Sequence, residues 1–308
     1  MPKAYVFTRY GGPETEAFAE LDRPSPGPGQ LLVAVRAAGV NPVDWKLRGG
    51  LRRPGDTGER VFPAVFGSEV SGVVEELGDG LTGFAVGDEV FGNTVAGGYA
   101  EYALLSAEVT AHKPARLSFA DAATLPVAAA TAYDGVRQLD LPACATLLIT
   151  GAGGGVGAAA VQIARNFGLR VVGVASAAKK DFVESLGAVH VPAGPGLAER
   201  VRAAAPDGVD AVYDLVGGAV LAEAAGLLAD RTKLISAGAA PQTVAELGGS
   251  RVARARTAAV LDAVADLVLG GRLNPYVTRR FPLDRADEAL RSVEDGHALG
   301  KTVIEVAV

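Results

Sequence analysis

The most constraining feature of the chain is the segment 147–168, LLITGAGGGVGAAAVQIARNFG, in which an apolar strand, a glycine-rich turn and an alanine-rich helix follow one another. In the frame G-x-G-x-x-G the three positions are Ala152, Gly154 and Gly157, so alanine replaces the first glycine. Gly154 would let the backbone approach a pyrophosphate, and Gly157 would let the helix pack closely against the strand. The segment therefore predicts a dinucleotide-binding turn, and the alternative is a tight turn without a ligand.

Strands and helices alternate on both sides of this turn, from Leu117 to about Gly271. Strands are expected at 147–150, 171–175, 210–216 and 233–239, and helices near 156–167, 178–186, 219–229 and 254–270. Such alternation is typical of a parallel sheet with helices on both faces. The predicted fold class is therefore α/β, with a Rossmann-type doubly wound parallel sheet in residues 117–274.

The rest of the chain has a different pattern. Residues 1–116 contain short β-branched runs bounded by Gly, Pro, Asp or Asn, which favour an antiparallel barrel or sandwich. The tail, 275–308, contains a strand, a helix at 284–294 and a final strand. Because the final strand has no alternating partner after it, we expect it to rejoin the first domain. The prediction is a discontinuous domain, 1–116 and 275–308, with the domain 117–274 inserted.

Charge and composition exclude several classes of protein. The 308 residues carry a formal net charge of −6, from 29 basic and 35 acidic residues, which argues against a nucleic-acid-binding surface. No apolar run approaches the ~20 residues that a membrane-spanning helix needs, and the start of the chain has no cleavable signal pattern. We therefore expect a cytoplasmic protein. The single cysteine, Cys144, excludes an intramolecular disulfide and a multi-cysteine zinc site.

The end of the second strand indicates the cofactor. An NAD-selective site has an acidic residue there for the ribose 2′-hydroxyl, but this strand ends in VGVAS at Ser176, without an acid. Lys179 and Lys180 follow, and their amines could pair with a 2′-phosphate. The sequence therefore predicts NADP(H), unless both lysines are solvated helix residues. In the turn, the expected cofactor-binding residues are Ala152, Gly153, Gly154, Gly155, Val156 and Gly157.

Several segments together resemble the medium-chain dehydrogenase/reductases, and among them the zinc-independent quinone oxidoreductases (zeta-crystallin-like). They occur in the family's order: GVNPVDWKLRGG (39–50), FPAVFGSEVSGVVEELG (62–78), GDEVFG (87–92), GGYAEY (97–102), LPVAAATAY (125–133), GAGGGVGAAAVQIA (151–164), VYDLVGG (212–218) and GHALGKTVIEV (296–306). The resemblance implies a GroES-like β-barrel domain, built from the N-terminal part and the tail, together with the Rossmann domain.

The same resemblance predicts that no zinc is bound. The zinc-dependent branch has a cysteine and a histidine where this chain has Asn41 and Ser68, and neither replacement is a strong zinc ligand. The histidines, His112, His190 and His297, are isolated from one another and are expected to be structural or at the surface. Without a metal to stabilise an alkoxide, alcohol oxidation is disfavoured. The expected reaction is hydride transfer from NADPH to a quinone or an α,β-unsaturated carbonyl compound.

The resemblance also suggests catalytic residues. Asn41 is expected beside the nicotinamide and the substrate, with Asp44 and Lys46 in the same N-P-x-D-x-K loop. Lys46 is a candidate donor to the developing oxyanion, and the alternative is that it pairs with Asp44 or a nearby acid to fix the loop. The candidate substrate-pocket walls, which could equally be barrel core, are Trp45, Phe62 and Phe91.

Three further residues are expected near the cofactor by resemblance. Thr131 and Gly238 would lie near the nicotinamide, and Lys301 would either touch a phosphate or simply start the last strand. Two other functions remain open: a cofactor-binding structural or regulatory protein with little turnover, and an enoyl reductase acting on a carrier-bound acyl group. A homodimer, joined through an edge strand of the Rossmann sheet, is expected only from the family.

Overall fold

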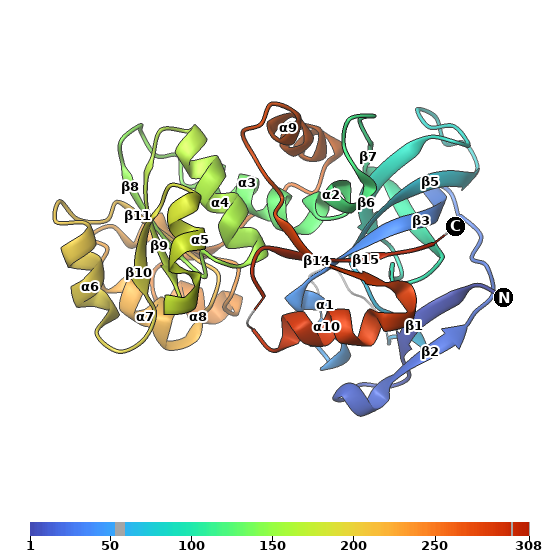
Figure 1. Ribbon diagram of the computed structural model, residues 1–308, viewed down its shortest axis with the longest axis horizontal. Helices are drawn as coiled ribbons and strands as arrows, with labels where there is room; N and C mark the ends of the chain where they lie inside the picture. Colours follow the sequence, from blue (N-terminus) through green and yellow to red (C-terminus); the bar gives the residue numbers. More distant parts are fainter. Residues whose placement is uncertain (53–58, 297, 308) are drawn as a thin grey trace. The chain divides into compact units, whose positions relative to one another are not determined.

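The computed structural model describes residues 1–52, 59–296 and 298–307, so the prediction for His297 lies outside the described residues. The chain divides into two compact units (Figure 1). The barrel unit comprises Met1–Val127, Arg256–Asp266 and Val277–Val308, and the parallel-sheet unit comprises Ala128–Ala255 and Leu267–Tyr276. The domain boundaries expected from the sequence stay a prediction.

The parallel-sheet unit is built on six strands in the order β10-β9-β8-β11-β12-β13, and every neighbouring pair is parallel. The first strand, β8, lies in the middle, and the chain adds strands outward to one side and then to the other. This is the doubly wound order, so the predicted Rossmann-type sheet is confirmed. The strands are β8 (Thr146–Thr150), β9 (Arg170–Ala175), β10 (Val189–Pro192), β11 (Ala211–Asp214), β12 (Leu234–Ser236) and β13 (Ser250–Arg251).

Helices cover both faces of this sheet (Figure 1). One face packs against α6, α7 and α8 in a shared apolar cluster, whereas α4 contacts β8 and β9, and α5 contacts β9 and β10. The helices are α3 (Ala130–Gln138), α4 (Gly155–Asn166), α5 (Lys180–Ser185), α6 (Leu197–Ala204), α7 (Gly218–Ala225) and α8 (Pro241–Glu246). The sheet is therefore buried on both sides, as its continuous apolar strands require.

The helix expected at 254–270 is shorter than predicted. It is α9 (Ala258–Leu269), and the division between the two units falls within it. Arg256 has a φ of 48°, in the left-handed region. A right-handed helix cannot include a residue in that conformation, so the helix starts beyond it.

The barrel unit contains a closed ring of antiparallel strands. β3 pairs with β5, β5 with β6 and β6 with β7, and β7 returns to pair with β3. Closure removes the exposed edges of a sheet, and it confirms the predicted antiparallel barrel. The four strands are β3 (Gln30–Val40), β5 (Glu69–Leu77), β6 (Glu89–Thr94) and β7 (Tyr102–His112).

The tail of the chain extends this sheet. β15 (Lys301–Glu305) pairs antiparallel with β3, and β14 (Val277–Pro282) pairs parallel with β15. α10 (Ala286–Glu294) connects them and contacts both. A smaller sheet has the order β2-β1-β4, formed by β1 (Lys3–Phe7), β2 (Glu16–Glu20) and β4 (Ala64–Val65).

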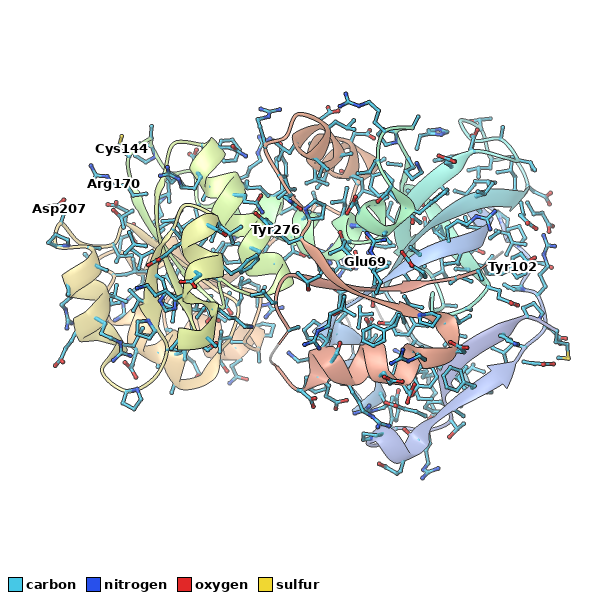
Figure 2. The ribbon with its side chains drawn as sticks, in the orientation of Figure 1. Glu69, Tyr102, Cys144, Arg170, Asp207 and Tyr276 are labelled. Carbon is cyan, nitrogen blue, oxygen red and sulfur yellow. The ribbon has the colours of Figure 1, made fainter. Side chains whose placement is uncertain are left out.

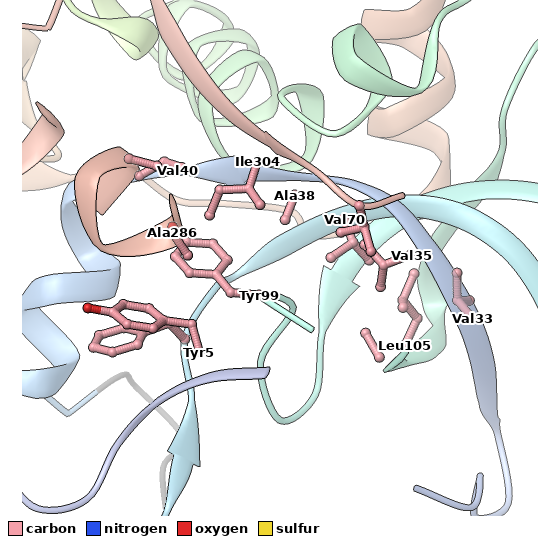
Figure 3. Packing of buried hydrophobic residues seen from close by; sticks show 14 of the residues in the cluster. Tyr5, Val33, Val35, Ala38, Val40, Val70, Tyr99, Leu105, Ala286 and Ile304 are labelled. Carbon is pink, nitrogen blue, oxygen red and sulfur yellow. The ribbon is translucent and has the colours of Figure 1, made fainter. Parts of the chain in front are cut away.

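Aromatic and aliphatic side chains from these strands form one core (Figure 3). The ring of Phe66 stacks on Tyr5 with centroids 5.3 Å apart, and the ring of Tyr99 lies 6.2 Å from Phe66. Val70 and Ile304 complete it from β5 and β15, with 0% of each residue exposed. The C-terminal strand is therefore part of the barrel core.

Short elements link the main ones. These are α1 (Pro42–Arg48), α2 (Phe119–Ala122), a π-helix (Leu125–Ala129) and four 3₁₀ turns (Pro13–Thr15, Ala177–Lys179, Arg231–Lys233 and Leu283–Arg285). The N-P-x-D-x-K segment, expected to be a loop, is helical in α1. Pro42 is its first residue, and Asp44 accepts a hydrogen bond from the Asn41 N–H, which is half of a capping box. Among the described residues, no helix has the length and apolar character to cross a membrane.

Candidate functional site

The glycine-rich turn lies at the carboxyl end of β8. Gly151 follows the strand with a φ of 71°, a conformation that favours glycine, and Gly154 is the N-cap of α4. The first N–H groups of a helix have no partner inside it, so the amides of Gly155, Val156 and Gly157 point out of the helix N-terminus. Such amides, together with the helix dipole, bind phosphate.

Glycine is suited to two positions of this turn, 157 and 154, for different steric reasons. A Cβ at Gly157 would lie 2.2 Å from the Gly151 carbonyl oxygen and 2.7 Å from the Ala152 Cα, so only glycine lets α4 pack on the turn. A Cβ at Gly154 would meet one atom within 4 Å, the Gly151 carbonyl oxygen at 3.5 Å. The space beside Gly154 is therefore open, which fits the approach of a pyrophosphate.

The two lysines after β9 occupy different environments. Lys179 is partly buried, and a Cβ at Gly153 would lie 2.6 Å from its Cδ, so its stem crosses the glycine turn. Burial lowers the pKa of Lys179 from its ordinary value. Lys180 is exposed, with its Nζ 4.0 Å from a carboxylate oxygen of Glu184. Ser176, also exposed, immediately follows β9. Lys179 therefore has the better geometry for a group held at the turn.

Gly238 and Thr131 also belong to the parallel-sheet unit. A Cβ at Gly238 would lie 2.6 Å from the Leu215 carbonyl carbon, so the turns after β11 and β12 pack directly on each other. Thr131 is buried in α3, and its carbonyl accepts a 2.8 Å hydrogen bond from the Tyr213 hydroxyl. Burial raises the pKa of Tyr213, which keeps this hydroxyl a donor.

The opposite edge of the same sheet has a different character. Cys144, close before β8, is exposed (Figure 2). Arg170, the first residue of β9, and Asp207 form an exposed ion pair of 3.7 Å. None of the predicted cofactor residues belongs to this amino-terminal edge. The candidate cofactor site is thus the carboxyl edge, as expected for a doubly wound sheet.

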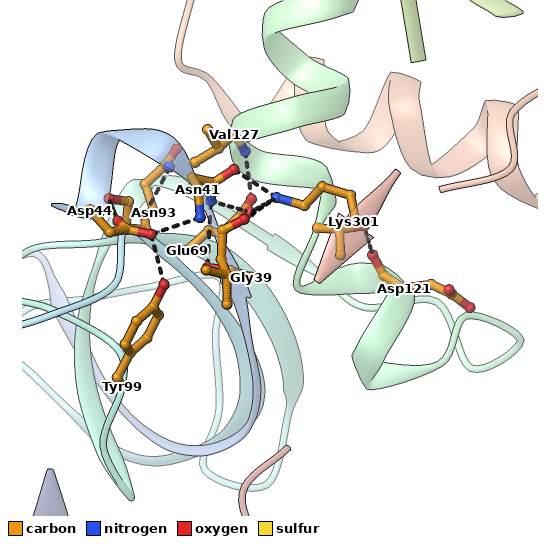
Figure 4. A network of polar contacts seen from close by, with 12 residues as sticks. Gly39, Asn41, Asp44, Glu69, Asn93, Tyr99, Asp121, Val127 and Lys301 are labelled. Atoms are coloured by element: carbon orange, nitrogen blue, oxygen red, sulfur yellow. Dashed lines mark hydrogen bonds and ion pairs between the residues drawn. The ribbon is translucent and has the colours of Figure 1, made fainter. Parts of the chain in front are cut away.

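In the barrel unit, a buried network surrounds Asn41, which follows the end of β3 (Figure 4). The Asn41 Nδ2 donates to the Glu69 Oε1 over 2.7 Å, and its Oδ1 accepts from the Lys301 Nζ over 2.6 Å. Lys301 also donates to the Val40 carbonyl and to the Glu69 Oε1, both over 3.0 Å. Glu69 and Lys301 are 0% and 4% exposed, so this is a buried ion pair.

This network limits what Asn41 and Lys301 can do. The remaining N–H of the Asn41 amide points to the Gly39 carbonyl at 3.4 Å, so both donors of this amide are directed into the protein. Lys301 has three N–H donors, and it has three acceptors within the barrel unit. The structure therefore favours the alternative that Lys301 starts the last strand over the expected contact with a phosphate.

Glycine at position 39 makes room for the ion pair. A Cβ there would lie 2.2 Å from the Glu69 Oε1 and 2.4 Å from the Ala123 carbonyl oxygen. The other carboxylate oxygen of Glu69 accepts from the Val127 N–H over 2.7 Å, inside the π-helix. Glu69 therefore connects β3, β15 and the π-helix.

Asp44 is a second buried acid of this unit. Its Oδ2 accepts from the Asn41 N–H over 2.9 Å and from the Tyr99 hydroxyl over 2.8 Å, and its Oδ1 accepts from the Ser68 Oγ over 2.5 Å. Burial raises the pKa of Tyr99 well above its ordinary value. Lys46 is partly buried, with its Nζ 5.6 Å from the centre of the Trp45 ring. Asp44 thus fixes the start of α1, whereas Lys46 remains the more accessible of the two.

The three aromatic residues expected to line a substrate pocket differ in exposure. Phe91 is 0% exposed in β6, so it leaves no surface for a substrate and forms barrel core instead. Phe62 is partly buried, with its ring edge-on to Tyr10 at 5.2 Å. Trp45 is also partly buried against the core. Only Trp45 and Phe62 therefore keep surface that a ligand could reach.

Sequence reasoning did not single out Glu69 or Asp214. Both are acids inside apolar runs, EVSGVV and AVYDLV, and both are fully buried. A fully buried acid is rare without polar partners. An acidic residue within a predicted buried strand was therefore the sequence signal that could have identified Glu69 and Asp214. The described part of the chain contains no group of three or more His, Cys, Asp and Glu side chains that could hold a metal ion.

Comparison with known proteins agrees with this architecture. Residues 27–115 match the alcohol dehydrogenase GroES-like domain, and residues 186–304 match the zinc-binding dehydrogenase family. The quinone-oxidoreductase QR1 of Triphysaria versicolor is 31% identical, over 98% of each chain. The NADPH-dependent alkenal/one oxidoreductase of Arabidopsis thaliana is 30% identical, over 98% of this chain and 79% of its own. A solved mycobacterial structure, Rv1454c complexed with NADPH, superposes with a TM-score of 0.87 at 29% identity, covering 99% of this chain and 100% of its own.

A glycine turn on a doubly wound sheet, combined with a closed antiparallel barrel, defines a two-domain oxidoreductase of the nicotinamide-dependent kind. The chain belongs to the medium-chain dehydrogenase/reductase family, in its quinone oxidoreductase (zeta-crystallin-like) branch.

Proposed function

We propose that this protein is an NADPH-dependent reductase that transfers hydride to quinones or α,β-unsaturated carbonyl compounds without zinc. The observation that carries the proposal is the pairing of the glycine turn with Lys179, at the end of a strand that has no acid for a ribose hydroxyl. A 2′-phosphate would find a cation there, whereas an NAD-selective site would provide a carboxylate.

The residues of the turn fit the cofactor. The amides of Gly155, Val156 and Gly157 would hold the pyrophosphate, and Ser176 and Lys179 would hold the 2′-phosphate. When bound, NADPH supplies the hydride. The protein binds it, orients it and excludes water, which is most of what a conjugated acceptor requires.

The buried ion pair supports a reaction without zinc. The Asn41 Oδ1 and the Glu69 Oε1 both bind the Lys301 ammonium, at 2.6 and 3.0 Å. A divalent cation between the same oxygens would be repelled by that ammonium in a low-dielectric interior. Without a Lewis acid, a conjugated acceptor that spreads the arriving charge is the better substrate.

Cofactor binding and turnover test the proposal separately. NADPH and NADH are titrated by fluorescence, and NADPH oxidation is then followed with small quinones, small enones and a carrier-bound enoyl group. We expect NADPH to bind about 100-fold more tightly than NADH, and turnover with small acceptors. Equal affinity for both cofactors contradicts the NADPH assignment. Tight binding without any turnover favours a structural or regulatory protein, and turnover only with the carrier-bound group favours an enoyl reductase.

The remaining proposals concern metal, assembly and location. The purified enzyme is expected to stay active after chelation and to contain no stoichiometric zinc by elemental analysis. We also propose a cytoplasmic homodimer joined through an edge strand of the parallel sheet, with a mass of two chains in light scattering. Loss of activity on chelation, or a monomeric mass, contradicts the corresponding part.

A further inference from the structure

A single buried carboxylate joins three strands at the carboxyl edge of the parallel sheet. Asp214 is the last residue of β11 and is 0% exposed. Its Oδ1 accepts from the Thr150 hydroxyl over 2.7 Å, and its Oδ2 accepts from the Ser236 hydroxyl over 2.6 Å. Thr150 ends β8 and Ser236 ends β12, and both are 0% exposed. Asp214 therefore connects the two neighbouring strands through their side chains.

The two hydroxyls extend these connections to the turns. The Thr150 oxygen accepts from the Leu215 N–H over 3.0 Å, and the Ser236 oxygen accepts from the N–H groups of Gly238 and Ala239 over 3.1 and 3.0 Å. A hydroxyl has one hydrogen, and each of these donates it to Asp214. The lone pairs are therefore directed at the backbone amides, so the carboxylate sets the orientation of both hydroxyls.

Asp214 also holds its own turn. Its carboxylate accepts from the Val216 N–H over 3.2 Å and from the Gly217 N–H over 3.1 Å. Asp214 thus anchors the turns after β11 and β12, and it holds the end of β8 through the Thr150 hydroxyl. Gly151 begins the glycine turn directly after Thr150, and Gly238 lies in the turn after β12.

We propose that Asp214 is a positioning residue for the cofactor. Through the Thr150 hydroxyl it fixes the end of β8, from which the glycine turn starts, and through the Ser236 hydroxyl it fixes the backbone at Gly238, in the geometry that binds NADPH. This inference rests on the proposed function, because it assumes that the cofactor occupies the carboxyl edge. Asp214 itself is fully buried and acts only through its neighbours.

Asparagine cannot replace this aspartate. An asparagine side chain has one oxygen acceptor, so its NH₂ group would face one of the two hydroxyls. If it faced the Ser236 oxygen, that atom would have to accept a third hydrogen bond and would lose the amide of Gly238 or Ala239. An isosteric Asp214→Asn change therefore disturbs the turns without creating a cavity.

The experiment compares NADPH dissociation constants and melting temperatures of matched variants. Asp214→Asn and Thr150→Val are expected to raise the NADPH dissociation constant by about 10- to 100-fold, which is the cost of misaligning one charge-assisted hydrogen bond to a phosphate. Thr150→Ser keeps the hydroxyl, so its dissociation constant is expected within about twofold of wild type.

Two controls separate positioning from loss of stability. Val212→Ala removes buried volume two residues earlier in β11, and Asp210→Ala removes a 2.6 Å bond to the Thr146 N–H at the amino end of β8. Both are expected to lower the melting temperature while leaving the NADPH dissociation constant within about twofold of wild type.

The inference is overturned if Asp214→Asn binds NADPH as tightly as the wild-type protein. It is also overturned if Val212→Ala weakens NADPH binding as much as Asp214→Asn does at the same loss of stability. In both cases, NADPH binding by the wild-type protein still supports the proposed function. A wild-type protein that fails to bind NADPH overturns both. If Asp214→Asn does not fold, the difference between Thr150→Val and Thr150→Ser decides, and equal constants overturn the inference.

Discussion

Each unit of the protein contains a fully buried carboxylate, and the two have different hydrogen-bond partners. Glu69 in the barrel unit pairs with the Lys301 ammonium and with the amide of Asn41. Asp214 in the parallel-sheet unit has two hydroxyls and two backbone amides as partners. Both side chains are 0% exposed, so burial is the same and only the partners differ.

The difference indicates what each carboxylate is for. An ion pair contains two charges, so removing one partner leaves the other uncompensated inside the protein. Hydroxyls and amides are directional and neutral, so they transmit position more than charge. We therefore expect changes at Glu69 and Lys301 to act mainly on stability, and changes at Asp214 to act mainly on the geometry of the cofactor edge.

The largest expected effect comes from breaking the ion pair on one side. Lys301→Met leaves Glu69 buried without its cation, and the free energy of unfolding should fall by about 3–5 kcal/mol. The double variant Glu69→Gln with Lys301→Met removes both charges and should recover most of that loss, as measured by urea denaturation. A double variant no more stable than Lys301→Met would show that charge is not the cause.

The next largest effect is expected for replacing the glycine that lies beside each buried carboxylate network, Gly39 near Glu69 and Gly238 near Asp214. Gly39→Ala would place a Cβ 2.2 Å from the Glu69 Oε1, and Gly238→Ala would place one 2.6 Å from the Leu215 carbonyl carbon. Overpacking of this kind costs about 1–3 kcal/mol of stability. Only Gly238→Ala alters the cofactor edge directly, so its NADPH dissociation constant should rise more than that of Gly39→Ala. A larger rise in the NADPH dissociation constant for Gly39→Ala than for Gly238→Ala would contradict the assignment of the two networks to different roles.

Lys179 allows a test of charge at the cofactor edge. Because burial lowers its pKa, Lys179 loses its proton at a lower pH than an ordinary lysine, and the preference for NADPH over NADH should fall as pH rises into the alkaline range. Lys179→Gln should weaken NADPH binding about tenfold and leave NADH unchanged. Lys179→Arg should hold the preference at high pH, because arginine stays charged.

The matched control for Lys179 is Lys180→Gln. Lys180 is exposed and lies near Glu184, so this change should leave the ratio of the two cofactor affinities within about twofold of wild type. If Lys180→Gln has the larger effect in fluorescence titrations, the two lysines have been assigned the wrong way round.

The smallest effect is expected for an exposed ion pair. Arg285 and Glu288 lie 2.6 Å apart on the surface, with about half of each side chain exposed. Arg285→Gln should change the free energy of unfolding by less than about 1 kcal/mol in urea denaturation. A loss as large as that of Lys301→Met would mean that burial does not distinguish the two ion pairs.

Local signals in the sequence were sufficient to predict the main strands and helices and the glycine turn. The glycine turn at 151–157 depends on residues next to one another, so its strand, turn and helix could be predicted together. The capping pattern of α1 was also local: Pro42 follows Asn41 and Asp44 comes three positions after it. The family resemblance describes this segment as a loop, although Pro42 after Asn41 is a helix-start signal.

The networks could not be predicted in the same way. The bond between Lys301 and Glu69 joins residues 232 positions apart, and those from Asp214 span 64 and 22 positions. Nothing in a sequence pattern specifies which distant polar group meets a buried acid. For this reason the sequence leaves two roles open for Lys301, a phosphate contact or the start of the last strand, and the structure directs its donors to Val40, Asn41 and Glu69.

By itself, the sequence determined the doubly wound sheet, the antiparallel barrel and the position of the glycine turn, because periodicity and glycine placement act over a few residues. The tertiary structure decided which polar groups share a buried site, because a carboxylate out of water must find partners wherever the strands bring them. Glu69 and Asp214 are each one acid in an apolar run. Only the folded chain gives one of them an ammonium and the other two hydroxyls.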